Sequence, residues 1–91
     1  MTARQIIFSG RVQGVGFRYS VKQIAAGFEV EGSVRNLADG TVEVRVMAWD
    51  VEELDAFQQE IENSHLSSFI KEVEASEIPP LEGVTGFSIR R

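Results

Sequence analysis

Short segments in which apolar and polar residues alternate predict the strands of this protein. A period of two places alternate side chains on opposite faces of a strand. In residues 41–48, Val42, Val44 and Val46 are expected to point inward, whereas Glu43 and Arg45 are expected to point outward. The same kind of reading predicts strands over residues 4–9, 30–36, 41–48, 67–76 and 84–90, the last with Phe87 and Ile89 inward.

Two other segments follow the period of a helix, which is about 3.6 residues. Counted from Phe17, apolar residues recur at i+4, i+7, i+8 and i+11, which predicts a helix over residues 18–28. A second helix is predicted to start after Asp50, whose side chain would cap it with Glu53 as the reciprocal partner. Its buried stripe is expected to consist of Val51, Leu54, Phe57 and Ile61.

The order of these elements predicts a fold of the α+β class. Strand, helix, strand, strand, helix and strand, with a short closing strand, is typical of the ferredoxin-like βαββαβ sandwich. Because each helix has one apolar stripe, both are expected to cover the same face of an antiparallel sheet. A chain of 91 residues fits a single domain, predicted to span residues 1–91. This fold carries many functions, so it indicates none by itself.

Composition excludes several kinds of site. The chain has no cysteine, which excludes disulfides, thiolate metal sites and cysteine nucleophiles. His65 is the only histidine and is expected on the surface without a role, so we expect no metal. No apolar run approaches the roughly 20 residues that span a membrane. Residues 1–5 lack the apolar stretch of a secretory signal, so a cytoplasmic location is expected.

Charge is distributed unevenly along the chain. The net charge of −5 argues against a nucleic-acid partner held through phosphate contacts. Residues 1–28 nevertheless carry four basic residues and no acid, whereas residues 29–91 carry all 14 acids against five bases. This imbalance indicates a small anion site in the first part of an otherwise acidic protein.

The segment from Gly10 to Arg18, which reads GRVQGVGFR, joins the first strand to the first helix. Main-chain N–H groups at such a turn, together with those at a helix start, suit an anion. Gly14 and Gly16 can take positive φ and let the main chain approach a ligand closely. Arg18 can hold a phosphate through two hydrogen bonds at once.

Three known phosphate loops provide a comparison. The G-x-G-x-x-G pattern fails because Tyr19 stands where the last glycine is needed, and the G-x-x-x-x-G-K pattern fails because no lysine follows. In the Cys-x5-Arg loop of cysteine phosphatases, the cysteine would stand at Val12. The loop thus has the length of a phosphate cradle but no nucleophile, so water would have to attack directly.

The same segment resembles the acylphosphatase signature G-x-V-Q-G-V-x-F-R at every fixed position. Residues 32–43, GSVRNLADGTVE, are similar to the second signature of that family, and the resemblance covers roughly residues 4–90. It implies the ferredoxin-like fold and the hydrolysis of small-molecule acyl phosphates to a carboxylate and inorganic phosphate, without a metal or another cofactor.

The resemblance also implies the roles of individual residues. Arg18 is expected to bind the phosphate, Asn36 to orient the attacking water, and the substrate phosphate to take the proton of that water. Main-chain N–H groups are expected to bind the phosphate along the loop at Val12, Gln13, Gly14, Val15, Gly16 and Phe17. Broad acyl specificity and a monomer are expected. The sequence departs from the family at four places. The family often has a glycine near Glu29, a large aromatic residue at Ser33, a glycine at Trp49 and Gly-Pro near Ser64-His65. Trp49 is expected to pack at the strand end.

Two alternatives stay open at this point. Residues 7–10 and 14–17 faintly echo the aromatic motifs of a ferredoxin-like RNA-binding module, but there the second motif lies on the third strand. A catalytically silent interaction domain that kept the loop is the other alternative. Salt-dependent retention on single-stranded RNA would favour the first, and folded protein without turnover would favour the second.

Overall fold

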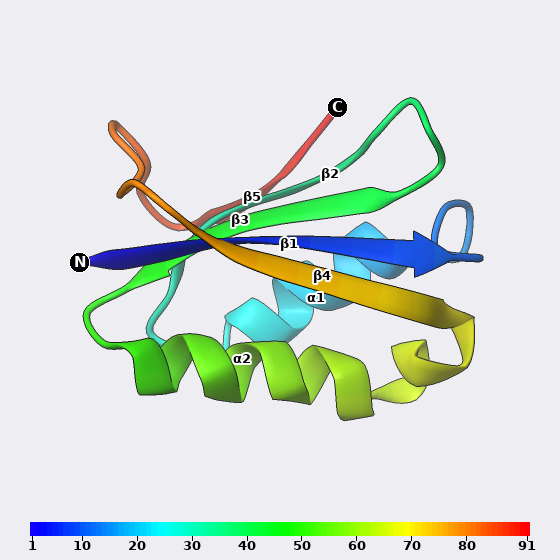
Figure 1. Cartoon of the computed structure of the whole chain (residues 1–91), viewed down its shortest axis with the longest axis horizontal. Helices are drawn as coiled ribbons and strands as arrows, with labels where there is room; N and C mark the ends of the chain where they lie inside the picture. The colour runs from blue at the N-terminus through cyan, green and yellow to red at the C-terminus, as the bar shows by residue number, and fades with distance from the viewer.

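The computed structural model describes residues 1–91 and packs two helices against one sheet of five strands (Figure 1). In chain order the elements are β1 (Thr2–Gly10), α1 (Phe17–Ala25), β2 (Glu31–Asn36), β3 (Val42–Ala48), α2 (Val51–Asn63), the 3-10 helix η1 (His65–Phe69), β4 (Ile70–Ile78) and β5 (Phe87–Arg90). The strands lie in the order β4-β1-β3-β2-β5, and both helices lie on the same side of them. The predicted ferredoxin-like sandwich is confirmed.

The last strand makes the sheet mixed rather than wholly antiparallel. β1 pairs antiparallel with β3 and β4, and β2 pairs antiparallel with β3. β5 instead runs parallel to β2, with Phe87 opposite Gly32 and Arg90 opposite Arg35. The segment between β4 and β5 therefore carries the chain from one edge of the sheet to the other.

The hydrophobic core fills the space between the helices and the sheet. The Phe8 and Phe17 rings are 5.2 Å apart, and the Phe57 ring lies 5.8 Å from those of both Phe28 and Phe87. Such tilted and edge-on contacts are favourable for aromatic rings. The core therefore holds α1, α2 and β5 together, and it fixes the end of β1 from which the next loop leaves.

Several predicted boundaries are wrong, including the start of the closing strand, which was predicted at residue 84 and lies at Phe87. The first helix starts at Phe17 and ends at Ala25, because the N–H group of Phe28 turns back to the Ala25 carbonyl at 3.1 Å. The strand predicted over residues 67–76 starts only at Ile70. Before it, the hydroxyl of Ser64 accepts from the N–H group of Leu66 at 3.1 Å and caps η1. No helix is both long and apolar enough to cross a membrane.

The start of α2 matches the prediction only in part. The Asp50 carboxylate accepts from the N–H group of Glu53 at 3.0 Å, as expected of a cap. The Glu53 carboxylate does not reciprocate, because it accepts from the N–H group of Glu29 at 2.8 Å. Val51 was predicted to belong to the buried stripe and Trp49 to pack at the strand end, but they are 48% and 77% exposed. The buried stripe begins one turn later, at Leu54, so the residues before it lie outside the core.

Two side chains on the strands differ from the prediction in how far they are buried, not in the face on which they lie. Glu43 lies on the sheet face without helices but is only 6% exposed. Its carboxylate accepts hydrogen bonds from Gln5 Nε2 and Arg35 Nε, each at 2.7 Å, and these neighbours cover it. Ile89 was predicted to point into the core, yet it is 36% exposed, because β5 is an edge strand. Phe87, at the start of the same strand, is half-buried against the core.

Candidate functional site

The loop between β1 and α1 is anchored at both ends and exposed between them. Val12 and Phe17 are only 1% and 2% exposed, because their side chains belong to the core. Gln13, Gly14 and Gly16 between them are exposed. Figure 1 shows this loop at the same end of the sheet as the hairpin between β2 and β3. The main chain of the loop is therefore held firmly while it faces solvent.

Two glycines give the loop its shape. Gly14 and Gly16 have φ angles of 78° and 77°, in the left-handed region that disfavours any residue with a Cβ atom. Gly16 is also the residue before α1, where no side chain caps the helix and the first turn holds no acid. No negatively charged side chain therefore compensates the positive end of the α1 helix dipole.

Consecutive N–H groups of the loop have no partner in the protein. The N–H group of Arg11 donates to the Phe69 carbonyl at 2.9 Å, and the next hydrogen bond begins at the N–H group of Ser20, which donates to the Gly16 carbonyl at 3.0 Å. The N–H groups of residues 12–16 donate to no main-chain or side-chain acceptor. The first N–H groups of a helix also have no intrahelical acceptor. These donors together have the chemistry of a phosphate-binding loop.

The guanidinium of Arg18 has no acidic partner. Its Nη1 atom donates to the main-chain carbonyl of Arg90 at 3.3 Å, which is long for a hydrogen bond of this type. The salt bridges of the protein involve Arg4 and Arg35, and neither includes Arg18. Arg18 therefore keeps its full charge and most of its donors for an anion.

One pocket of about 280 Å³ brings the predicted residues together. Arg18 from the start of α1 and Asn36 from the end of β2 both line it. Four residues of the loop complete this part of the lining, namely Val12, Gly14, Gly16 and Phe17. The half-buried Asn36 carboxamide takes part in no hydrogen bond with its neighbours in the hairpin, so its donors and its acceptor are free. Residues 18 positions apart in the sequence thus share one small cavity.

Gln13 and Val15 belong to the predicted loop but do not line the pocket. Gln13 Nε2 donates to the carbonyl oxygens of Leu37 and Thr41, each at 2.9 Å. Leu37 directly follows Asn36, so Gln13 ties the loop to the hairpin that carries the carboxamide. Val15 packs partly buried against the core. Both side chains therefore hold the loop in place.

The charges around the pocket favour an anion. Arg18 and Arg91 line it, and no acidic residue does, although the chain has a net charge of −5. Asp39 lies outside the lining, at the tip of the hairpin. The hydroxyl and N–H groups of Thr41 donate to its carboxylate at 2.6 and 3.0 Å, and they hold the pKa of Asp39 below its ordinary value of 3.8. No group of three or more histidine, cysteine or carboxylate side chains is arranged to hold a metal ion.

Three further residues line the pocket that sequence reasoning did not assign to it, Tyr19, Ile89 and Arg91. Tyr19 is 61% exposed. It directly follows Arg18, the last residue of the first signature, and this adjacency could have indicated that it lies near the site. Ile89 and Arg91 reach the site only because β5 pairs with β2, and no local sequence signal predicts that pairing.

Comparison with known proteins agrees with this geometry. The family model of acylphosphatases matches residues 4–89. An acylphosphatase from Bacillus licheniformis is 40% identical over 89 residues, which cover 98% of this chain and 98% of the relative. An acylphosphatase from Pseudomonas paraeruginosa is 43% identical over 84 residues, which cover 90% of this chain and 88% of the relative. The crystal structure of an acylphosphatase from Bacillus subtilis matches the whole of both chains with a TM-score of 0.88 and 36% identity. The chain therefore belongs to the acylphosphatase family, whose members hydrolyse acyl phosphates.

Proposed function

We propose that residues 1–91 act as one acylphosphatase domain in which an oriented water attacks the phosphorus of an acyl phosphate directly. One observation carries the proposal: unpaired N–H donors, a guanidinium without an acid and a free carboxamide line the same pocket. Arg18 and Asn36 are the two residues that we assign to the chemistry.

The loop and Arg18 bind the phosphoryl group. Main-chain N–H groups of residues 12–17 donate to its oxygens, and the Arg18 guanidinium donates two parallel hydrogen bonds. Phosphoryl transfer mainly requires positioning and stabilisation of charge on the three equatorial oxygens. Because these donors are already in place, they need little rearrangement when that charge develops.

Asn36 orients the water. A carboxamide both donates and accepts hydrogen bonds, so it can fix the direction of a water lone pair without acting as a base. A bond forms between the water oxygen and phosphorus while the bond to the bridging oxygen breaks. The electron pair of that bond leaves with the carboxylate, which needs no proton at neutral pH. The water proton passes to an oxygen of the phosphoryl group, so the step uses neither a metal nor another cofactor.

The direct test is hydrolysis of a simple acyl phosphate such as benzoyl phosphate in the presence of EDTA. Arg18→Ala is expected to weaken phosphate binding and to lower kcat/KM by about 10³ or more. Asn36→Ala is expected to lower kcat by roughly 10²–10³ while inorganic phosphate still inhibits at wild-type concentrations. Arg11→Ala removes an exposed cation that does not line the pocket, and it serves as the control.

Three results would contradict the proposal. Full activity of Asn36→Ala would show that the carboxamide does not orient the water. Loss of activity in EDTA that a divalent metal restores would show that the reaction depends on a metal. Folded wild-type protein without turnover of several acyl phosphates would favour a catalytically silent domain.

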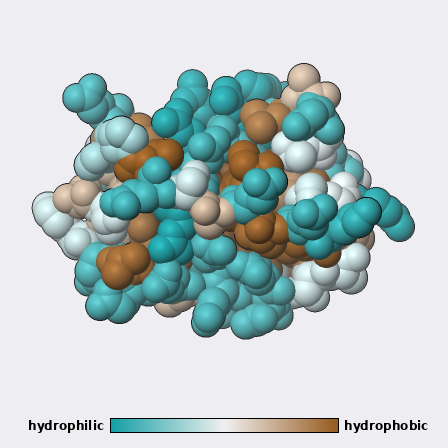
Figure 2. Space-filling model, in the orientation of Figure 1, coloured by the Kyte–Doolittle hydropathy of each residue, from teal (hydrophilic) through white to brown (hydrophobic).

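We also propose a cytoplasmic monomer without a nucleic-acid partner. The acidic net charge supports the last point, and the small number of large apolar side chains that are exposed supports the monomer. Figure 2 shows hydrophobic residues in small areas separated by hydrophilic ones on the face it presents. Light scattering during gel filtration, cell fractionation and retention on single-stranded RNA test the three points separately.

A further inference from the structure

A second hollow lies on the sheet face that the helices leave open. Its volume is about 520 Å³, within the range of small-molecule sites, which is roughly 300–1,000 Å³. Ser33, Arg45 and Arg90 line it from three neighbouring strands, and the connection between β4 and β5 forms its wall. It shares no lining residue with the pocket of Arg18.

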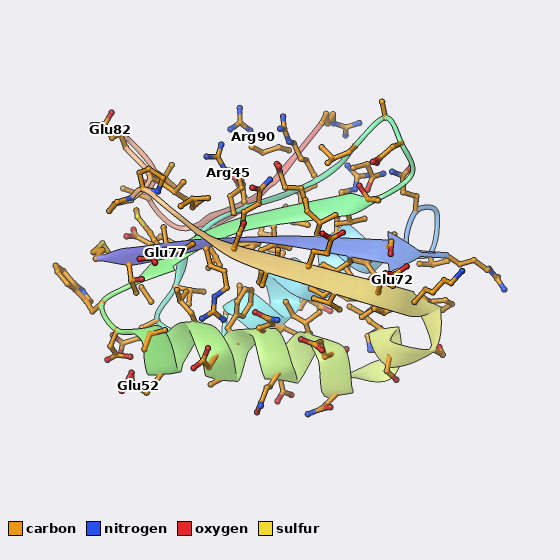
Figure 3. The ribbon with its side chains drawn as sticks, viewed as in Figure 1. Arg45, Glu52, Glu72, Glu77, Glu82 and Arg90 are labelled. Carbon is orange, nitrogen blue, oxygen red and sulfur yellow. The ribbon has the colours of Figure 1, made fainter.

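Strand pairing places the two arginines over this hollow. Ser33 on β2 pairs with Arg45 on β3 and with Ser88 on β5. Arg90 pairs with Arg35, two residues further along β2 and on the same face. Arg45 and Arg90 therefore rise from strands on either side of β2. Figure 3 shows both side chains on the side of the sheet away from α2.

Neither guanidinium is neutralised within the protein. The side chains of Arg45 and Arg90 take part in none of the hydrogen bonds or salt bridges, in contrast to Arg35, which donates to Glu43 at 2.7 Å. Glu82 is the one acid that lines the hollow, and it forms no ion pair. Two cations face one acid there, which leaves a positive site on a chain with a net charge of −5.

The opposite wall is apolar. Pro79 and Pro80 fix the chain as it leaves β4, and Leu81 and Val84 are half-buried against the open face. A ligand that contacts both walls needs an apolar body against the prolines, Leu81 and Val84, and a planar anionic head group that the two arginines can bind. The fork of a guanidinium matches a carboxylate in this way.

We propose that this hollow binds a small organic carboxylate with an apolar body, at a site separate from the pocket of Arg18. Both β2 and β5 contribute lining residues to each of the two sites. The side chain of Arg90 lines the hollow, whereas its carbonyl accepts from Arg18 and its neighbour Ile89 lines the other pocket. The inference depends on the geometry of the open face and not on the proposed function.

Benzoate is a suitable probe, and two-dimensional amide NMR of the full chain locates its binding. We expect saturable shift changes at residues 33, 45, 81–84 and 88–90, and we expect them to persist in Arg18→Ala. The double variant Arg45→Gln/Arg90→Gln should bind benzoate about tenfold more weakly, because two charge-assisted contacts are lost. Lys71→Gln removes an exposed cation on β4 outside the hollow and should leave the affinity unchanged.

Val84→Asp provides a second variant that alters no strand. It places a carboxylate in the apolar wall and should also weaken benzoate binding about tenfold by repulsion. Dispersed amide spectra establish that each variant is folded. The proposal is overturned if benzoate causes no saturable change, if its shifts are confined to residues 12–19, or if the folded variants bind it as tightly as the wild type. Because the probe is a carboxylate and not an acyl phosphate, failure here leaves the proposed hydrolysis untouched.

Discussion

The core beneath the helices and the loop after β1 differ in whether their interacting groups have partners within the protein. In the core, apolar side chains are fully enclosed, and no buried polar side-chain atom lacks a hydrogen-bond partner. In the loop, the N–H groups of residues 12–16 have no acceptor, and Arg18 has no acid. The core is complete without a ligand, whereas an anion supplies the acceptors that the loop lacks. Substitutions in the core should therefore change stability, and substitutions in the loop should change phosphate binding and turnover.

The largest effect is expected in the core. Phe57→Ala removes a buried ring in contact with Phe28 and Phe87, which should lower the free energy of unfolding by about 3–5 kcal/mol. Urea denaturation measures the change. Trp49→Ala removes another large ring, but one that is 77% exposed, and should change stability by less than about 0.5 kcal/mol. Equal losses in the two variants would contradict the contrast between core and surface.

The next effect is expected in the loop. Gly16→Ala meets no atom within 4 Å, so its penalty comes only from the left-handed main chain, about 1–2 kcal/mol. We expect kcat/KM to fall about tenfold, as the strained loop misplaces its donors. Gly83→Ala is the matched control, because Gly83 has a φ of 69°, is equally open and lies outside the pocket. If both variants lost the same activity, strain alone would explain the result and the loop would have no special role.

A smaller effect is expected at the contact between the loop and the hairpin. Gln13→Ala removes two hydrogen bonds of 2.9 Å that join the loop to Leu37 and Thr41. Each such bond contributes roughly 0.5–1.5 kcal/mol to the stability of the contact between the loop and the hairpin. Without these bonds Asn36 should be displaced from its place in the pocket, and we expect kcat to fall about fivefold. In an Asn36→Ala background the same change should have little further effect on kcat, because the two residues act together. Additive losses would show that Gln13 does not act through Asn36.

The smallest effect is expected at the tip of the hairpin. The bonds from Thr41 lower the pKa of Asp39 in the folded state. A lowered pKa stabilises the fold above the unfolded pKa, about 3.9 for an aspartate, and this contribution is lost as the pH falls through the folded value. The stability difference between the wild type and Asp39→Asn should therefore shrink below about pH 3.9. Urea denaturation across this pH range measures it, and a difference that grew on acidification would have the wrong sign.

Local patterns in the sequence predicted much of this structure. Alternation placed Val42, Val44 and Val46 in the core, and helical spacing did the same for Leu54 and Phe57. Both signals depend only on which face of one element a residue occupies. The motif from Gly10 to Arg18 likewise predicted a strand, a loop and a helix in order, and the two predicted glycines do take positive φ.

What the sequence did not predict depends on contacts between distant segments. Glu43 is buried because Gln5 and Arg35 from neighbouring strands bond to it, and alternation within its own strand contains no such information. Ile89 and Arg91 join the site only through the parallel pairing of β5 with β2. In the same way, nothing in the local sequence showed that Trp49 would lie beyond the core.

One measurement tests the central claim most directly: hydrolysis of benzoyl phosphate in water labelled with a heavy oxygen isotope, followed by mass spectrometry of both products. If the loop and Arg18 hold the phosphoryl group while Asn36 directs water at phosphorus, all of the incorporated label appears in inorganic phosphate and none in benzoate. Label in benzoate would mean that water attacks the carbonyl carbon, and it would contradict the account.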